Sequence, residues 1–399
     1  MNFARSTFHP NVRVLQAHTF CFHAIFILPV LVPYFREVIG VGFQEFLLGE
    51  AIFSATVLLM EVPTGWLSDV WTRRKTFIAS TVVSLIGWIF LWQATSFSMV
   101  VIAQIFLGIA ISLLSGTNSA LLYDSLLEDS TEHHYLRLEG FRHGVSLYSV
   151  GGASLLGGVL YAWHVELPII ATIAFNVLAL LLTLFAVEPS RHRDQPHRNP
   201  FVDMAQTMRY ALYGHSEIAG IIFISAGLFA GTKVLLWIQQ PYYLLLALPV
   251  EWFGVLAACG FLLGGLASHY GHLSKGYHDT GLLFLLLALL VSVCVISGLW
   301  PGWHGVPLLL TGSLIWGFGW PRMQEAINAR VSSGRRATIL STASLMKHVV
   351  SIPLFVVIGR VEDQFGVDWG LLTLAGGLLV AGCIAFVPLL NEKRTLKVP

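Results

Sequence analysis

Four ionisable residues interrupt long apolar stretches of this sequence: Glu50, Glu61, Lys233 and Lys347. An ionisable residue inside a membrane-spanning helix costs several kcal/mol and by default marks a functional site. Burial favours the neutral form of a carboxylate, so a buried glutamate can take up a proton near neutral pH. Glu50 and Glu61 are therefore candidates for binding a coupling proton. Their spacing of eleven residues, about 16 Å along a helix, places both on one helical face.

Lys233 and Lys347 fall near the middle of their apolar stretches, and neither has an acidic partner within its own stretch. A lysine at that depth extends its ammonium group to the membrane surface only poorly, so we expect it to face a cavity. There it would bind an anionic group of a substrate. The alternative is that each lysine forms a salt bridge with an acid on another helix. Arg322 and Glu325 are spaced i,i+3 and are predicted to neutralise each other.

Amide and indole side chains cluster near glycine and proline in two apolar stretches, "WIQQPYY" and "WGFGWPR". Aromatic groups with a few amides are typical of a cavity for a small organic molecule. The candidates for lining such a cavity are Gln239, Gln240, Trp316 and Trp320. Glycine and proline also predict that both helices are interrupted at these points. The alternative for the aromatic residues is ordinary packing between helices.

The elements that must position these residues are membrane-spanning helices. Hydrophobic residues make up 55% of the 399 residues, charged residues only 11%, and mean hydropathy is +0.72. A soluble domain has about 25% charged residues, and roughly 20 apolar residues cross a bilayer as a helix. The sequence predicts an all-α membrane protein with twelve transmembrane helices. The expected spans are 14–34, 43–67, 75–95, 98–124, 139–162, 167–187, 217–246, 250–270, 279–299, 305–328, 337–359 and 369–390.

Basic residues are divided unequally between the two sides of such a protein. Twelve spans place both termini on one side. Of the 23 lysines and arginines, 17 lie on that side, two lie opposite (Arg36 and Arg360) and four lie inside spans. Because lysine and arginine are enriched in cytoplasmic loops, both termini are predicted to be cytoplasmic.

A polar, basic and proline-containing segment at 188–201 divides the spans into two groups of six. It predicts two pseudo-symmetric six-helix bundles, residues 1–187 and 214–399. The linker between them, 188–213, includes an amphipathic stretch at 201–213 that is expected to lie along the membrane surface.

An internal repeat relates the two halves. "GWLSDVWTRRK" at 65–75 aligns with "GLASHYGHLSK" at 265–275, and each segment follows the second span of its half. Repeats of this kind are typical of secondary transporters, with the substrate site between the halves. In the first copy an acid, Asp69, precedes the basic pair Arg73 and Arg74, which is an unusual concentration of charge for this sequence.

The motif G-x-x-x-D-x-x-x-R-R-K, the two groups of six spans and the basic central segment resemble the major facilitator superfamily of transporters. The resemblance covers essentially the whole chain. "EVPTGWLSD", "ALLYDSL" and "RATILS" are similar to a bacterial group of drug and metabolite exporters within that superfamily. Thr72 departs from the usual motif, which carries glycine there, so the turn is expected to be less tight.

The resemblance implies that this loop is a gate between the two halves. Gly65 would let the second helix approach a neighbour closely, and Asp69 would face the positive N-terminal end of the eleventh helix. Arg73 would pair with Asp124, while Arg74 is either part of the gate or only a topology signal. These contacts would latch the halves together when the substrate cavity faces outward and would break when it faces inward.

The sequence therefore predicts a secondary active transporter that moves a small organic molecule by alternating access. The first hypothesis is export of a drug or metabolite, including a carboxylate or siderophore-like compound, in exchange for protons. The alternative is import of an organic anion by proton symport. A membrane-embedded lipid-modifying enzyme is disfavoured, because the sequence contains no H-E-x-x-H and no G-x-S-x-G motif. Direct use of ATP is disfavoured by the absence of a P-loop.

The expected partners are the substrate, protons as the coupling ion and membrane lipids, with no nucleic acid. We expect a monomeric, multi-pass protein of the bacterial inner (plasma) membrane. No catalytic residue, cofactor or metal site is expected, since the four cysteines lie in apolar stretches without metal-ligand spacing.

Overall fold

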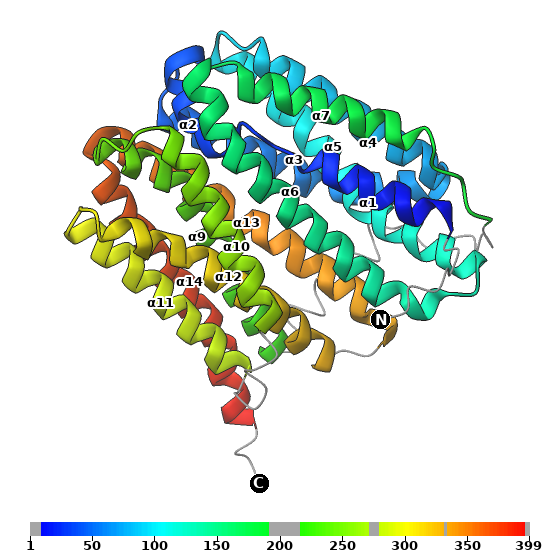
Figure 1. The fold of residues 1–399 in the computed structure, drawn as a ribbon. Helices are drawn as coiled ribbons and strands as arrows, with labels where there is room; N and C mark the ends of the chain where they lie inside the picture. The colour runs from blue at the N-terminus through cyan, green and yellow to red at the C-terminus, as the bar shows by residue number, and fades with distance from the viewer. Residues whose placement is uncertain (1–8, 191–215, 271–278, 331–332, 396–399) are drawn as a thin grey trace.

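The computed structural model describes residues 9–190, 216–270, 279–330 and 333–395, and this part of the chain is built from helices and contains no strand. The amphipathic segment expected at 201–213 lies outside the described residues. The helices form two bundles, the first from the blue-to-green part of the chain and the second from the yellow-green-to-red part (Figure 1).

In the described part of the chain each bundle contains six helical segments. In the first they are α1 (Pro10–Phe22) continued by η1 (Leu28–Val30), α2 (Leu31–Tyr34) and η2 (Phe35–Ile39), then α3 (Phe43–Val70), α4 (Arg73–Trp92), α5 (Phe97–Glu128), α6 (Tyr135–Trp163) and α7 (Leu167–Thr183), with η3 (Glu132–His134) before α6. In the second they are α9 (Ser216–Leu245), α10 (Glu251–Tyr270), α11 (Asp279–Leu299), α12 (Gly305–Arg330), α13 (Ser333–Phe365) and α14 (Val367–Thr395).

The twelve predicted spans correspond to these twelve segments. Nine of the described helices are long and apolar enough to cross a membrane, as judged by length and composition. The exceptions are α7, which is apolar but only 17 residues long, α12, and the divided first segment. The predicted all-α fold is confirmed, and most helix ends fall within a few residues of the expected ones.

The positions of the helix breaks differ from the prediction. The first span was expected to be one helix at 14–34, but α1 ends at Phe22 and the chain continues through η1 to α2. Conversely, α9 and α12 were expected to be interrupted and are continuous through Pro241 and Pro321. A proline inside a membrane helix frees only a few backbone groups, which neighbouring helices can satisfy.

Gln240 of α9 explains why the first span can break inside the protein. Its Oε1 accepts a hydrogen bond from the backbone N–H of Val32 at 2.8 Å, and its Nε2 donates to the carbonyl of Leu28 at 3.1 Å. Non-helical backbone at membrane depth is tolerated only where other protein groups complete its hydrogen bonds. One buried amide of the second bundle does this for the first.

The two ends of the bundles differ in charge. One end contains the turn between α3 and α4 with Arg73 and Arg74, the start of α6 and the end of α12 with Arg330. We call it the basic end. The other, which we call the opposite end, contains the start of α3, the end of α6, the start of α10 and the end of α13. Between the bundles, α3 packs against α13 and α6 packs against α10.

At the opposite end the two bundles meet backbone to backbone. A Cβ added at Gly158 of α6 would lie 2.8 Å from the carbonyl oxygen of Glu251 and 3.0 Å from the amide nitrogen of Gly254 on α10. A Cβ at Gly359 of α13 would lie 3.0 Å from the Cα of Gln44 on α3. Glycine permits such close approach of membrane helices, so the opposite end is closed.

At the basic end the corresponding glycines are open. A Cβ at Gly65 of α3 or at Gly265 of α10 would meet no atom of the described residues within 4 Å. The expectation that Gly65 allows a close helix approach is therefore wrong for this conformation. The close approach is made by Gly158 and Gly254 at the other end of the bundles.

Candidate functional site

A cavity of about 240 Å³ lies between α6 of the first bundle and α9, α10 and α12 of the second. Most of its wall is apolar, with the rings of Phe229 and Phe261 among the lining groups. His143 of α6 and Ser268 of α10 extend the lining toward the basic end. Four of the six predicted substrate residues line this cavity: Lys233, Gln239, Trp316 and Trp320.

Lys233 forms a salt bridge that joins the two bundles. Its Nζ lies 3.0 Å from Oε2 of Glu50, and Gln104 donates a hydrogen bond to Oε1 of the same carboxylate at 3.3 Å. The rings of Phe53 and Phe355 lie 4.9 and 5.5 Å from the ammonium group. The Glu50 side chain is 8% exposed and that of Lys233 is 19% exposed, and only the lysine lines the cavity. The interhelical salt bridge considered as an alternative is therefore present.

Lys347 has a different environment. Its Nζ lies 3.6 Å from the centroid of the Trp320 ring, 5.5 Å from that of Phe229 and 6.0 Å from that of Trp316. All three rings line the cavity. Among the described residues no carboxylate forms an ion pair with Lys347, although Glu61 is close enough to interact with it electrostatically. The Lys347 side chain is thus held against the aromatic wall.

Glu61 also connects the bundles. Ser341 of α13 donates a hydrogen bond to its Oε1 at 3.3 Å, and its Oε2 is buried without a hydrogen-bond partner among the described residues. Glu50 and Glu61 therefore do lie on one face of α3, and this face is turned toward the second bundle. Two acids of one bundle meet two lysines of the other, Lys233 and Lys347.

The two glutamines have separate roles. Nε2 of Gln239 donates to the carbonyl of Leu309 at 3.1 Å, and the hydroxyl of Tyr243 donates to its Oε1 at 3.2 Å. Gln240 does not line the cavity, contrary to the prediction, because both ends of its amide are used by the broken first span. Adjacent residues on a helix point in different directions, and the sequence did not indicate which one faced the cavity.

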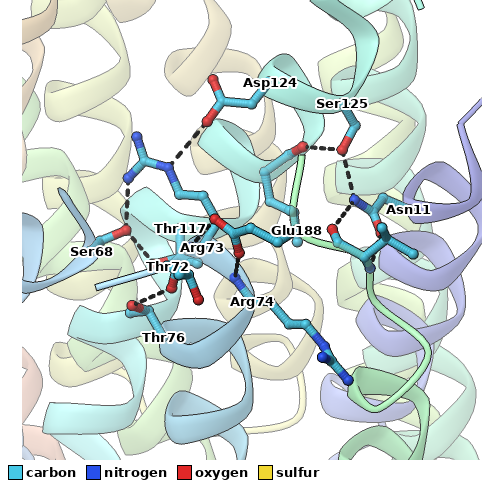
Figure 2. Close-up of polar contacts among 12 residues, drawn as sticks. Asn11, Ser68, Thr72, Arg73, Arg74, Thr76, Thr117, Asp124, Ser125 and Glu188 are labelled. Atoms are coloured by element: carbon cyan, nitrogen blue, oxygen red, sulfur yellow. Dashed lines mark hydrogen bonds and ion pairs between the residues drawn. The ribbon is translucent and has the colours of Figure 1, made fainter. Parts of the chain in front are cut away.

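The loop between α3 and α4 is ordered by contacts within the first bundle (Figure 2). Nε of Arg73 lies 3.3 Å from Oδ2 of Asp124, and its Nη1 donates to the hydroxyl of Ser68 at 2.7 Å. The carboxylate of Glu188 accepts from the backbone N–H groups of Arg73 and Arg74 at 3.0 and 2.7 Å. The predicted Arg73–Asp124 pair is present, and Glu188 caps the N-terminus of α4.

These contacts of Arg73, Asp124 and Glu188 fix the loop that carries the motif. The latch between the two halves stays a prediction. The side chain of Asp69 and the side chains of residues 331–338 lie outside the described part of the structure. The sequence reasoning missed Glu188, although an acid near a helix N-terminus is a recognisable signal.

A latch at the opposite end was also missed. Asp363, near the end of α13, accepts hydrogen bonds from the backbone N–H groups of Phe43 and Gln44 at 3.2 and 3.1 Å. These are the first residues of α3, whose N-terminal end favours a negative charge. Beside it, Arg36 donates to Glu362 at 3.2 Å. Both contacts join the first bundle to the second.

A match to a protein-family model shows the family of this chain. A family model described as Major Facilitator Superfamily matches residues 17–354. The chain belongs to the major facilitator superfamily. The resemblance of the motif at 65–75 to this superfamily is thereby confirmed. A search of curated proteins finds no match.

Solved structures of superfamily-type transporters share the fold. A mutant of the nucleoside transporter NupG matches with a TM-score of 0.78 at 14% identity, covering 95% of this chain and 98% of that one. A bacterial homolog of the human lysosomal transporter Spinster, in an inward-facing and unoccupied conformation, matches with a TM-score of 0.71 at 14% identity, covering 95% and 97%. A POT family transporter in complex with 5-aminolevulinic acid matches with a TM-score of 0.70 at 13% identity, covering 97% and 96%. At such identities the likeness concerns the fold alone.

Proposed function

We propose that this superfamily member is a secondary active transporter that moves a small organic molecule by alternating access. The observation that carries the proposal is the cavity, which is lined from both bundles and extends toward the basic end, while glycine contacts close the opposite end. The bundles, residues 1–187 and 214–399 joined by the linker 188–213, would move as rigid bodies around this site. The superfamily supports transport over lipid modification.

We place the basic end in the cytoplasm, because lysine and arginine are enriched in cytoplasmic loops. Both termini then lie in the cytoplasm, and the cavity faces inward. The resemblance of its motifs to those of bacterial exporters supports the proposal that the protein lies in a bacterial inner membrane, where it would act as a monomer surrounded by lipid.

Two directions of transport are consistent with this site. Export in exchange for protons follows from the resemblance of "EVPTGWLSD" and "ALLYDSL" to bacterial exporters. Import of an organic anion with protons is the second candidate, and the placement of Lys233 and Glu50 favours it. The lysine lines the cavity and the acid does not, so a ligand in the cavity meets a positive charge.

The gates are two carboxylates at the two ends of the α3–α13 pair. Asp363, near the end of α13, caps the start of α3 while the opposite end is closed. Asp69, near the end of α3, would cap the start of α13 in the same way when the basic end closes, with Gly65, Arg73, Arg74 and Asp124 fixing its loop. Because α3 and α13 run antiparallel, each cap joins the C-terminal end of one helix to the N-terminal end of the other, and the two caps belong to alternate conformations.

The two gates predict opposite effects of matched substitutions. Asp69→Asn is expected to abolish transport and favour the inward-facing state, with expression and membrane insertion unchanged. Asp363→Asn is expected to favour the outward-facing state about fivefold, since an exposed charge-assisted pair of hydrogen bonds is worth about 1 kcal/mol after screening. Alkylation of cysteines introduced at each end measures both shifts. Unchanged transport by Asp69→Asn, or shifts in the same direction, would contradict the gates.

Counterflow in proteoliposomes tests the proposed function. Vesicles containing purified protein are loaded with benzenesulfonate or benzyltrimethylammonium, which carry similar rings and permanent charges of opposite sign. We expect one of the labelled compounds to accumulate by exchange and Trp320→Ala to lose this activity, because the ring lines the cavity. Uptake of neither compound above the level of protein-free vesicles counts against transport of small aromatic ions.

A further inference from the structure

We propose that the cavity binds an organic anion together with one proton: the acidic group of the substrate replaces Glu50 on Lys233, and Glu50 takes up the proton. This inference rests on the proposed transport function and adds to it the charge of the substrate and the residue that couples it to protons. It is carried by the geometry of the salt bridge, the second lysine and the charge balance of the site.

Only one partner of the salt bridge, Lys233, lines the cavity. The ammonium group belongs to a lysine that lines the cavity, whereas the carboxylate of Glu50 comes from α3 and is not part of the wall. An anion in the cavity therefore reaches Lys233 directly, while a cation does not reach Glu50. To bind, the anion must compete with the carboxylate that already lies 3.0 Å from the ammonium.

The surroundings of Lys347, which include three aromatic rings, indicate the chemistry of the rest of the ligand. Lys347 lies against the faces of Trp320, Phe229 and Trp316, and these rings form the cavity wall. Among the described residues this lysine has no carboxylate within ion-pair distance. The aromatic wall suits an apolar or planar body, and Lys233 suits its acidic group. The ligand class is a small organic acid with an apolar body.

The net charge of the site explains why a proton binds together with the anion. Four charged groups face one another here and their formal charges sum to zero: Glu50, Glu61, Lys233 and Lys347. The other titratable groups around them are His143 on α6 and His348 on α13. A monoanion would leave the site with a net negative charge, which is costly in a low-dielectric interior, and one proton restores neutrality.

Glu50 is the group that receives this proton. Once the anion occupies Lys233, the carboxylate of Glu50 keeps only the neutral hydrogen bond from Gln104. An unpaired buried carboxylate favours its protonated form. Glu61 differs, because an anion on Lys233 displaces neither of its neighbours on the second bundle, Ser341 and Lys347. Anion and proton then bind together or not at all, and a monoanion together with its proton crosses the membrane with no net charge.

Binding of benzenesulfonate at pH 6 to 9 tests the inference, because a sulfonate does not titrate in this range. We expect the apparent Kd of the wild type to rise with pH, by up to about tenfold per pH unit, because binding of the anion takes up one proton. Glu50→Gln leaves Lys233 free, so its Kd should change less with pH than that of the wild type and should be lower at alkaline pH. Glu61→Gln should keep the pH dependence. If the salt bridge were only structural, Glu50→Gln would bind benzenesulfonate more weakly than the wild type at every pH.

A second variant covers the case in which Glu50→Gln does not fold. Exchanging the pair, Glu50→Lys with Lys233→Glu, keeps the ion pair and places the acid on the cavity wall. This variant is expected to lose benzenesulfonate binding and to gain benzyltrimethylammonium binding. The inference is overturned if the wild type prefers the cation, if it binds no benzenesulfonate at millimolar concentration, or if Glu50→Gln retains the wild-type pH dependence.

Proteoliposomes separate failure of this inference from failure of the transport function. Uptake of benzenesulfonate that follows a pH gradient and ignores an imposed potassium diffusion potential supports both. Exchange of benzyltrimethylammonium alone leaves transport standing and overturns the anion–proton site. Binding of benzenesulfonate with the expected pH dependence but without movement leaves the site standing and overturns transport.

Discussion

Substituting valine for Gly158 is expected to reduce transport and to shift the protein away from the conformation described here. The added side chain would meet the backbone of α10, with its Cβ only 2.8 Å from the carbonyl oxygen of Glu251 and 3.0 Å from the amide nitrogen of Gly254. Backbone atoms cannot relieve such a contact by a change of rotamer, as a side chain can. Such overpacking typically costs about 1–3 kcal/mol, which corresponds to a change of about 5- to 150-fold in the conformational equilibrium.

The same helix provides the control for Gly158→Val. Gly152 is exposed, and a Cβ there would meet no described atom within 4 Å, so Gly152→Val should transport normally. Accessibility is measured with a cysteine in place of Gln44, which packs against Gly359 in the closed end, in a background without the native cysteines. Labelling by a membrane-impermeant maleimide should increase in Gly158→Val only. Equal labelling of both variants would show that the opposite end is not held by this contact.

Replacing Gln240 by leucine is expected to cause the largest loss of stability. The N–H of Val32 and the carbonyl of Leu28 would lose their partner where the buried first span is broken into η1 and α2. Each unsatisfied buried group costs roughly 1–3 kcal/mol, so the total is about 2–6 kcal/mol. The midpoint of thermal unfolding in detergent should fall by many degrees.

The neighbouring Gln239→Leu is the matched control, because Gln239 and Gln240 are almost equally buried, at 6% and 4% exposed. In Gln239→Leu the carbonyl of Leu309, which lies inside α12, keeps its helical partner, and only the Tyr243 hydroxyl loses its hydrogen-bond acceptor. We therefore expect a smaller fall in stability and, because Gln239 lines the cavity, a change in ligand affinity. Equal destabilisation by the two variants would contradict the role assigned to Gln240.

The membrane-spanning helices could be located from the sequence because their signal is local. A run of about 20 apolar residues crosses the membrane wherever it occurs, so the limits of α3, α9 and α11 were predictable to within a few residues. The break in the first span was not predictable. It depends on an amide more than 200 residues away, Gln240, and only the fold brings the two together.

The same distinction holds for the charged residues of the site. The sequence by itself identified Glu50, Glu61, Lys233 and Lys347 as costly in a membrane and hence in need of partners or a cavity. Which partner each one has was decided by the tertiary structure. Glu50 and Lys233 are 183 positions apart, and helical periodicity relates only residues a few turns apart on one helix.

The residues proposed as gates differ in how far the sequence indicated them. Asp69 and Arg73 stood out in the motif after the second helix and Asp124 in "ALLYDSL", and the Arg73–Asp124 pair is present in the structure. The cap that Asp363 provides for α3 has no sequence motif, since it requires the end of one helix and the start of another to meet across the two bundles. Composition and spacing thus determined the helices and the residues that need partners. The packing of two bundles determined which partners those are, because ion pairs and caps depend on distance in space and not on distance along the chain.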